Sequence, residues 1–257
     1  MISAGIDCGA KNTKTIIMKD GTIIGKGSVL TGFDQKKAVE DSLAAAIGEA
    51  GISLDDVEKI GGTGSGKESV EMADKSVNDI KAMGKGANYF FPNSRTVSDV
   101  GAEEGRTAKL DGKGNAIDFA INDKCAAGAG AFIEAMGRAL ETPLEEMGPL
   151  ALTSHREIPM NAQCAIFAES EVVGLIHAKA EKNDISKAIH DAMASRLVSM
   201  IRRIGVNEDV VMLGGVGYNL GFVAAMRLQL ALDKVLIPDD PEYGAAVGAA
   251  VVAAEEI

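Results

Sequence analysis

Two cysteines in similar surroundings have the most specific chemistry of any residues in this chain. Cys125 lies in NDKCAAGAGAF (residues 122–132), and Cys164 lies in AQCAIFAESE (residues 162–171). Each thiol precedes a run of small and apolar residues that favours a helix. The free N–H groups and the dipole at a helix start stabilise a thiolate. Two thiols are too few for an iron–sulfur cluster with four cysteine ligands. Our hypothesis is therefore a cluster shared by two chains that contribute two cysteines each.

Buried, inert thiols are the alternative for both residues. The third cysteine, Cys8, alternates with Asp7 along a strand-like run, and we interpret it as a small buried hydrophobe. The three histidines show no metal-ligand spacing.

Aspartate followed by one residue and glycine occurs twice at the end of a strand-like run, in Asp7-Cys8-Gly9 and in Asp99-Val100-Gly101. Each copy is followed by two more strand-like runs joined by an Asp-Gly turn, which is typical of hairpins. Two carboxylates at strand ends can hold Mg²⁺ through water. Backbone N–H groups of the adjoining turns can bind the phosphates of a nucleotide. Ordinary turns are the alternative.

A third glycine-rich loop, Gly214-Gly215-Val216-Gly217-Tyr218-Asn219, follows a strand-like run and precedes a helical one. A nucleotide-binding loop has this context, although the full dinucleotide fingerprint and a P-loop lysine are both missing. A tight strand–helix turn is the alternative.

These motifs require elements that bring them together. The two meanders are 92 positions apart, which predicts duplicated α/β domains that face each other across a cleft, with one aspartate from each at the bottom. We expect lobes at residues 1–95 and 96–257, with room for the last helix to pack on the first lobe. The pattern predicts strands at 2–7, 15–19, 22–29, 57–61, 96–100, 106–110, 116–121, 209–213 and 234–237, and helices at 36–50, 75–91, 185–204 and 220–232, after residues 125, 143 and 164, and from 243.

Composition excludes several classes of protein. The net charge of −11 argues against general affinity for nucleic acid or anionic membranes, and the absence of Trp argues against base-stacking platforms. No apolar run reaches the ~18 residues of a membrane span. The chain enters a strand-like pattern at once, so we expect no signal peptide. Three cysteines in an acidic chain favour the reducing cytoplasm.

Five segments, in this order along the chain, resemble the motif set of the BadF/BadG/BcrA/BcrD family: residues 7–14, 99–101, 122–130, 164–172 and 214–219. That family contains the ATPase activators of 2-hydroxyacyl-CoA dehydratases and the ATPase subunits of benzoyl-CoA reductase. The two cysteine motifs distinguish it within the wider superfamily of sugar kinases, Hsp70 and actin.

The resemblance implies two ribonuclease-H-like lobes with ATP and Mg²⁺ in the cleft. It also implies a homo- or heterodimer with one 4Fe–4S cluster, held by Cys125 and Cys164 of each subunit. ATP hydrolysis would then drive a low-potential one-electron transfer from ferredoxin or flavodoxin to catalytic reductase or dehydratase subunits. The carried-over nucleotide and Mg²⁺ residues are Asp7, Gly9, Thr13 and Lys14 in the first loop, Asp99 and Gly101 in the second, and Gly214, Gly215 and Asn219 around adenosine.

One departure from the family pattern affects catalysis. The dehydratase activators usually have glutamine, which would position the attacking water, where this chain has Glu103. Glu103 would act as a catalytic base or leave a slow site. The loop looks closer to one class of benzoyl-CoA reductase subunits, so we expect a reductase ATPase subunit, with a dehydratase activator as the alternative. Alternatives from other classes are a sugar-kinase-like phosphotransferase and a nucleotide-gated interaction protein of the actin or Hsp70 type.

Overall fold

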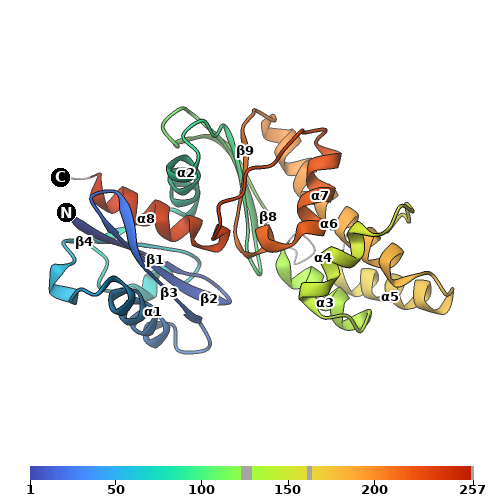
Figure 1. Cartoon of the computed structure of the whole chain (residues 1–257), viewed down its shortest axis with the longest axis horizontal. Coiled ribbons are helices and arrows are strands. Elements are labelled where there is room, and N and C mark those ends of the chain that lie inside the picture. Colours follow the sequence, from blue (N-terminus) through green and yellow to red (C-terminus); the bar gives the residue numbers. More distant parts are fainter. Residues whose placement is uncertain (123–128, 161–163, 256–257) are drawn as a thin grey trace.

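The computed structural model describes residues 1–122, 129–160 and 164–255, and it contains two mixed β-sheets (Figure 1). The first has the order β3-β2-β1-β4-β5, and the second has the order β8-β7-β6-β9. The strands are β1 (Ile2–Cys8), β2 (Asn12–Lys19), β3 (Thr22–Leu30), β4 (Lys59–Thr63), β5 (Lys75–Ser76), β6 (Thr96–Val100), β7 (Gly105–Leu110), β8 (Ala116–Asn122) and β9 (Val210–Leu213).

The two sheets repeat one topology. In each, the first strand pairs antiparallel with the second and parallel with the fourth. The register matches as well, because Asp7 faces Lys14 across β1 and β2, and Asp99 faces Arg106 across β6 and β7. The predicted duplication of the meander is therefore present, with each aspartate paired in register with a basic residue.

The helices are α1 (Gln35–Ala50), α2 (Asp79–Phe90), α3 (Gly130–Ala139), α4 (Leu144–Leu152), α5 (Ala165–His177), α6 (Lys182–Ile204), α7 (Leu220–Gln229) and α8 (Gly244–Ala254), with 3-10 turns η1 (Leu54–Asp56), η2 (Lys67–Ser69), η4 (Gly215–Tyr218) and η5 (Pro241–Tyr243). Helices α3 to α7 gather at one end of the molecule in Figure 1, around a core that includes Phe132, Met147, Ile189 and Phe222. No helix in the described part of the chain combines the length and apolarity needed to cross a bilayer.

Helices α2 and α8 lie between the two sheets and set their spacing. On β1, Ala4 and Ile6 share a core with α1, whereas Gly5 faces α8. Because side chains alternate along a strand, Asp7 lies on the α8 side of its sheet. By the same rule Asp99 shares a face with Val97, which packs with Ile80 of α2. Since α2 and α8 pack on each other, both aspartates lie on the faces that look toward the middle of the molecule (Figure 1).

The contact between these two helices depends on glycine. A Cβ on Gly248 of α8 would lie 1.7 Å from the Ala82 carbonyl oxygen of α2. The contact of α8 with the first sheet depends on glycine as well, because a Cβ on Gly5 of β1 would lie 1.9 Å from the Ala246 carbonyl oxygen of α8. Only hydrogen fits at these positions, so the backbones approach closely. The last helix of the chain is thereby packed on the first sheet.

Two predicted elements differ in the structure. The helix predicted from residue 75 begins only at Asp79, because Asn78 caps it by accepting a hydrogen bond from the Ile80 N–H, and residues 75–76 form β5. The strand predicted at 234–237 is reduced to one parallel bridge between Leu236 and Val211.

Candidate functional site

A pocket of about 710 Å³ opens between the two sheets, a volume within the usual range for small-molecule sites. Loops that follow β1, β4, β6 and β9 line it, together with α3 and α4. Nine of the residues predicted from the sequence meet there, although they are spread over more than 200 positions: Asp7, Gly9, Lys14, Asp99, Gly101, Glu103, Gly214, Gly215 and Asn219.

The two aspartates differ in their surroundings. Asp7 accepts a hydrogen bond from the Lys14 ammonium at 2.8 Å, and both side chains are largely buried. Burial opposes the charge of Lys14, but the Asp7 carboxylate raises the Lys14 pKa above its usual value. Burial also raises the pKa of Asp99, and the positive charge of Arg106 offsets only part of that effect. The negative charge of Asp99 is therefore less well balanced by nearby positive charge than that of Asp7.

Each carboxylate lies against the bare backbone of a glycine. Gly64 follows β4 with φ 94°, and a Cβ there would lie 2.4 Å from Asp7 Oδ1. Gly214 follows β9 with φ 85°, and a Cβ there would lie 2.5 Å from Asp99 Oδ1. Glycine is required at both positions by backbone conformation and by space. The loop at 62–67 is thus the structural counterpart of the predicted loop at 214–219, and the sequence alone does not show this equivalence.

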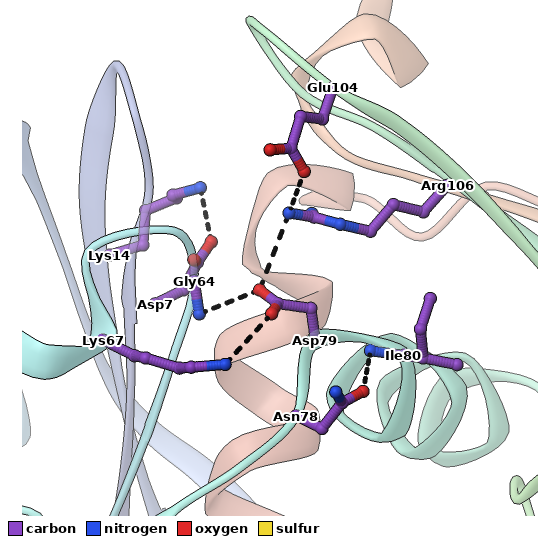
Figure 2. A network of polar contacts seen from close by, with 9 residues as sticks. All are labelled: Asp7, Lys14, Gly64, Lys67, Asn78, Asp79, Ile80, Glu104 and Arg106. Carbon is purple, nitrogen blue, oxygen red and sulfur yellow. Dashed lines mark hydrogen bonds and ion pairs between the residues drawn. The ribbon is translucent and has the colours of Figure 1, made fainter. Parts of the chain in front are cut away.

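Asp79 connects the two halves at the cleft (Figure 2). Its carboxylate accepts a hydrogen bond from the Gly64 N–H at 3.1 Å and lies 3.6 Å from the Lys67 ammonium. On the other side it lies 3.6 Å from Arg106, which also binds Glu104 at 2.5 Å. An acidic residue in the first turn of a helix is common, so sequence alone gave no reason to select Asp79.

Thr13 does not line the pocket. Its side chain is fully buried on the opposite face of β2, where the hydroxyl lies 3.7 Å from Cys8 Sγ and 2.9 Å from Thr31 Oγ1. Any contact of Thr13 with phosphate would have to come from its backbone. Cys8 is buried in the same core, and burial raises the pKa of its thiol.

A different part of the pocket is apolar and suits a base. Leu144, Pro149, Tyr218 and Leu220 line it from α4, η4 and α7. Asn219 caps α7 by accepting a hydrogen bond from the Phe222 N–H at 3.1 Å. Burial, with a contribution from the nearby Glu242 charge, raises the pKa of Tyr218 to about 12, so its hydroxyl stays neutral.

The charge of the pocket bears on which ligand it holds. Among the described residues, eight carboxylates line it, against the three cationic side chains of Lys11, Lys14 and Arg106. A polyphosphate would be repelled there unless a cation entered with it. Mg²⁺ prefers carboxylate and water oxygens, so Asp7 and Asp99 are a suitable donor pair for it. In the described ranges, no three His, Cys, Asp or Glu side chains form a group that could hold a metal by themselves.

Cys164 is the N-cap residue of α5 and is partly exposed. Two exposed apolar side chains follow it, Ile166 at 71% and Phe167 at 65% exposure. A thiol at a helix start has the chemistry of a cluster ligand. The other predicted ligand, Cys125, lies outside the described residues.

The family model for the BadF/BadG/BcrA/BcrD ATPase family matches residues 4–253. The chain belongs to this family. It is 36% identical to the activator of lactoyl-CoA dehydratase from Anaerotignum propionicum over 99% of this chain and 98% of that protein. It is 29% identical to a benzoyl-CoA reductase subunit from Thauera aromatica over 97% and 92% of the two chains. The predicted resemblance is therefore confirmed.

Solved structures confirm the predicted fold class for this family member. The activator of the 2-hydroxyisocaproyl-CoA dehydratase from Clostridium difficile, with bound ADPNP, superposes with a TM-score of 0.93 at 34% identity, over 100% of this chain and 95% of that one. A ROK family glucokinase from Streptomyces griseus reaches a TM-score of 0.61 at 16% identity, over 99% and 100% of the two chains. The glucokinase likeness concerns the fold alone.

Proposed function

We propose that this ATPase couples ATP hydrolysis to the transfer of single electrons, at low potential, to a partner enzyme that acts on a CoA ester. Mg²⁺–ATP would bind in the cleft, with its phosphates at the loops beside Asp7 and Asp99 and its base against the apolar part. The ADPNP bound to a relative with 34% identity supports this assignment of the pocket.

The nucleotide is proposed to lie between Gly9, Lys14 and Gly101 on the phosphate side and Gly214, Gly215 and Asn219 on the adenosine side. Bare glycine backbone at these positions leaves room for close approach and for N–H contacts. Glu103 is exposed at the same cleft, and we propose that it orients or deprotonates the attacking water. Mg²⁺, held by Asp7 and Asp99 through water, would supply positive charge to the phosphates.

The cysteines are proposed to serve a 4Fe–4S cluster shared by two subunits, with Cys125 and Cys164 from each. Cys164 at a helix start supports this, because the helix dipole favours the thiolate. The exposed apolar side chains of α5 support a second subunit over this helix: Ile166, Phe167, Val173 and Ile176. The bound cluster would supply a one-electron redox centre.

One observation supports the coupling of nucleotide and thiols more than any other. The first N–H groups of α3, the helix that follows the Cys125 segment, donate to the second phosphate loop, with Gly130 N–H to Gly101 O at 2.9 Å and Ala131 N–H to Ala102 O at 2.8 Å. A shift of this loop on nucleotide binding would therefore move the start of α3. ATP can drive such a shift only if it binds the two arrangements unequally.

The partner is proposed to be a 2-hydroxyacyl-CoA dehydratase or a reductase of the benzoyl-CoA type, with ferredoxin or flavodoxin as electron donor. Relatives of both kinds support this, and the lactoyl-CoA dehydratase activator shares more identity than the reductase subunit does. The Glu103 loop keeps the reductase interpretation open.

Metal content after anaerobic purification tests the proposal. We expect about two iron and two sulfide per chain, because four thiolates from two chains hold one cluster. Cys125→Ala and Cys164→Ala should each lose the iron and keep nucleotide binding, whereas Cys8→Ala is the matched control that keeps both. Full iron content in either of the first two variants would refute the ligand assignment.

A further inference from the structure

A partly exposed ion pair joins two segments that line the cleft. The ammonium of Lys11, in the turn between β1 and β2, donates to the Glu134 carboxylate of α3 at 2.5 Å. The two residues are 123 positions apart and both line the pocket. The first phosphate loop is thus connected to the helix whose start is hydrogen-bonded to the second phosphate loop.

Lys11 differs from the other cations of the cleft in the cost of changing its partner. Lys14 and Asp7 are only 14% and 11% exposed, so separating them would leave a buried carboxylate alone. Arg106 is likewise enclosed between Glu104 and Asp79. Lys11 and Glu134 are 49% and 29% exposed, so water can solvate either side chain after separation. Ion pairs of this kind are weak and are replaced readily.

A phosphate group is a stronger partner for an ammonium than one carboxylate, because it carries more charge and more acceptor oxygens. The position of Lys11 beside Gly9 and Lys14 puts it within the first phosphate loop. A nucleotide in the cleft would therefore compete with Glu134 for this ammonium. The more negative the phosphate chain, the more effective the competition.

We propose that Lys11 is a phosphate-binding residue and that Glu134 binds its ammonium when the cleft is empty. Binding of a nucleoside triphosphate exchanges the Lys11–Glu134 ion pair for a Lys11–phosphate contact, and α3 loses its connection to the first phosphate loop. This inference rests on the proposed function of the cleft. Glu134 is a positioning residue here, and Lys11 discriminates triphosphate from diphosphate.

Equilibrium binding of ADPNP and of ADP, each with Mg²⁺, tests the exchange in the purified full chain. Lys11→Met should weaken ADPNP binding about tenfold and ADP binding much less, because only the longer phosphate chain uses the ammonium. Glu134→Gln should strengthen ADPNP binding about fivefold, because the competing carboxylate charge is removed. Lys37→Met, which breaks an exposed pair with Asp41 on α1, is the control and should match the wild type.

Hydrogen exchange of the α3 amides (residues 130–139) is the second readout. ADPNP should increase their exchange in the wild type, and Glu134→Gln should show part of that increase without nucleotide. Wild-type ADPNP affinity in both Lys11→Met and Glu134→Gln overturns this inference alone, as does weaker binding by Glu134→Gln. A wild-type chain that binds no nucleotide overturns the proposed function and this inference with it.

Discussion

Adding one methyl group at Gly248 should separate the two helices that hold the sheets apart. A Cβ at this position of α8 would lie 1.7 Å from the Ala82 carbonyl oxygen, 2.6 Å from its carbonyl carbon and 2.8 Å from the Gly86 nitrogen. All three atoms belong to the backbone of α2, so no side chain can turn away. The helices must therefore move apart by more than ~1 Å to restore ordinary contact distances.

The free energy of unfolding should fall in Gly248→Ala despite the better helix propensity of alanine. Overpacking typically costs about 1–3 kcal/mol and more where rigid backbone is the obstacle. Replacing glycine inside a helix returns only about 1 kcal/mol. We expect a net loss of about 2 kcal/mol or more, which corresponds to a decrease in Tm of roughly 4–8 °C for a chain of this size.

Gly48→Ala is the matched control, because it makes the same chemical change at an exposed position of helix α1. No atom lies within 4 Å of a Cβ built there, so propensity alone acts and the Tm should rise by roughly 2–4 °C. Thermal unfolding followed by circular dichroism measures both variants. Because Ala245 of α8 and Glu242 of the preceding turn η5 line the pocket, Gly248→Ala should also weaken ADPNP binding. A Gly248→Ala protein that melts at or above the wild-type temperature would refute the close packing of α2 on α8.

Two further predictions concern single side chains. Alkylation of the iron-free protein at pH 8 should modify Cys164 and spare Cys8 until the chain unfolds. Burial excludes the reagent from Cys8 and raises the pKa of its thiol, which lowers the thiolate fraction. Peptide mass analysis measures the labelling, and early labelling of Cys8 would contradict its buried position. Glu103→Gln should lower the ATPase rate about 10²-fold or more if Glu103 is the base, with ADPNP affinity unchanged, whereas an equal or faster rate would show that it only orients water.

The sequence was sufficient for the fold because a repeat is a strong constraint. Asp7 and Asp99 each end a strand-like run and begin the same meander, so their meeting at one cleft followed from pattern alone. The position of the Thr13 side chain away from the pocket could have been predicted by the same kind of reasoning. Thr13 and Lys14 are neighbours on β2, and neighbouring side chains point to opposite faces of a sheet. Only one of them can face the pocket, and the basic residue does.

Other features of the site depend on contacts between segments that are far apart in the sequence, and no local sequence pattern predicts such contacts. Gly64 is one of several loop glycines in the chain, and its role against Asp7 follows only from the parallel pairing of β1 with β4. Asp79 is a helix-start acid like many others until Arg106 of the other sheet reaches it. The Lys11–Glu134 pair joins a turn to a helix more than a hundred positions away. The roles of these residues depend on how the two sheets are arranged around α2 and α8.

The two sheets repeat one topology, but their aspartates have different charged neighbours, and the difference suggests different roles for Asp7 and Asp99. In the first sheet, Asp7 is paired with the ammonium of one lysine at 2.8 Å. In the second, the cation opposite Asp99 is shared with Glu104 and Asp79, and burial leaves the Asp99 pKa raised. A buried carboxylate with too little positive charge nearby is costly, and a divalent cation removes that cost. If Mg²⁺ binds between the two carboxylates as proposed, Asp99 would therefore gain more from its charge than Asp7, which already has the Lys14 ammonium as a partner.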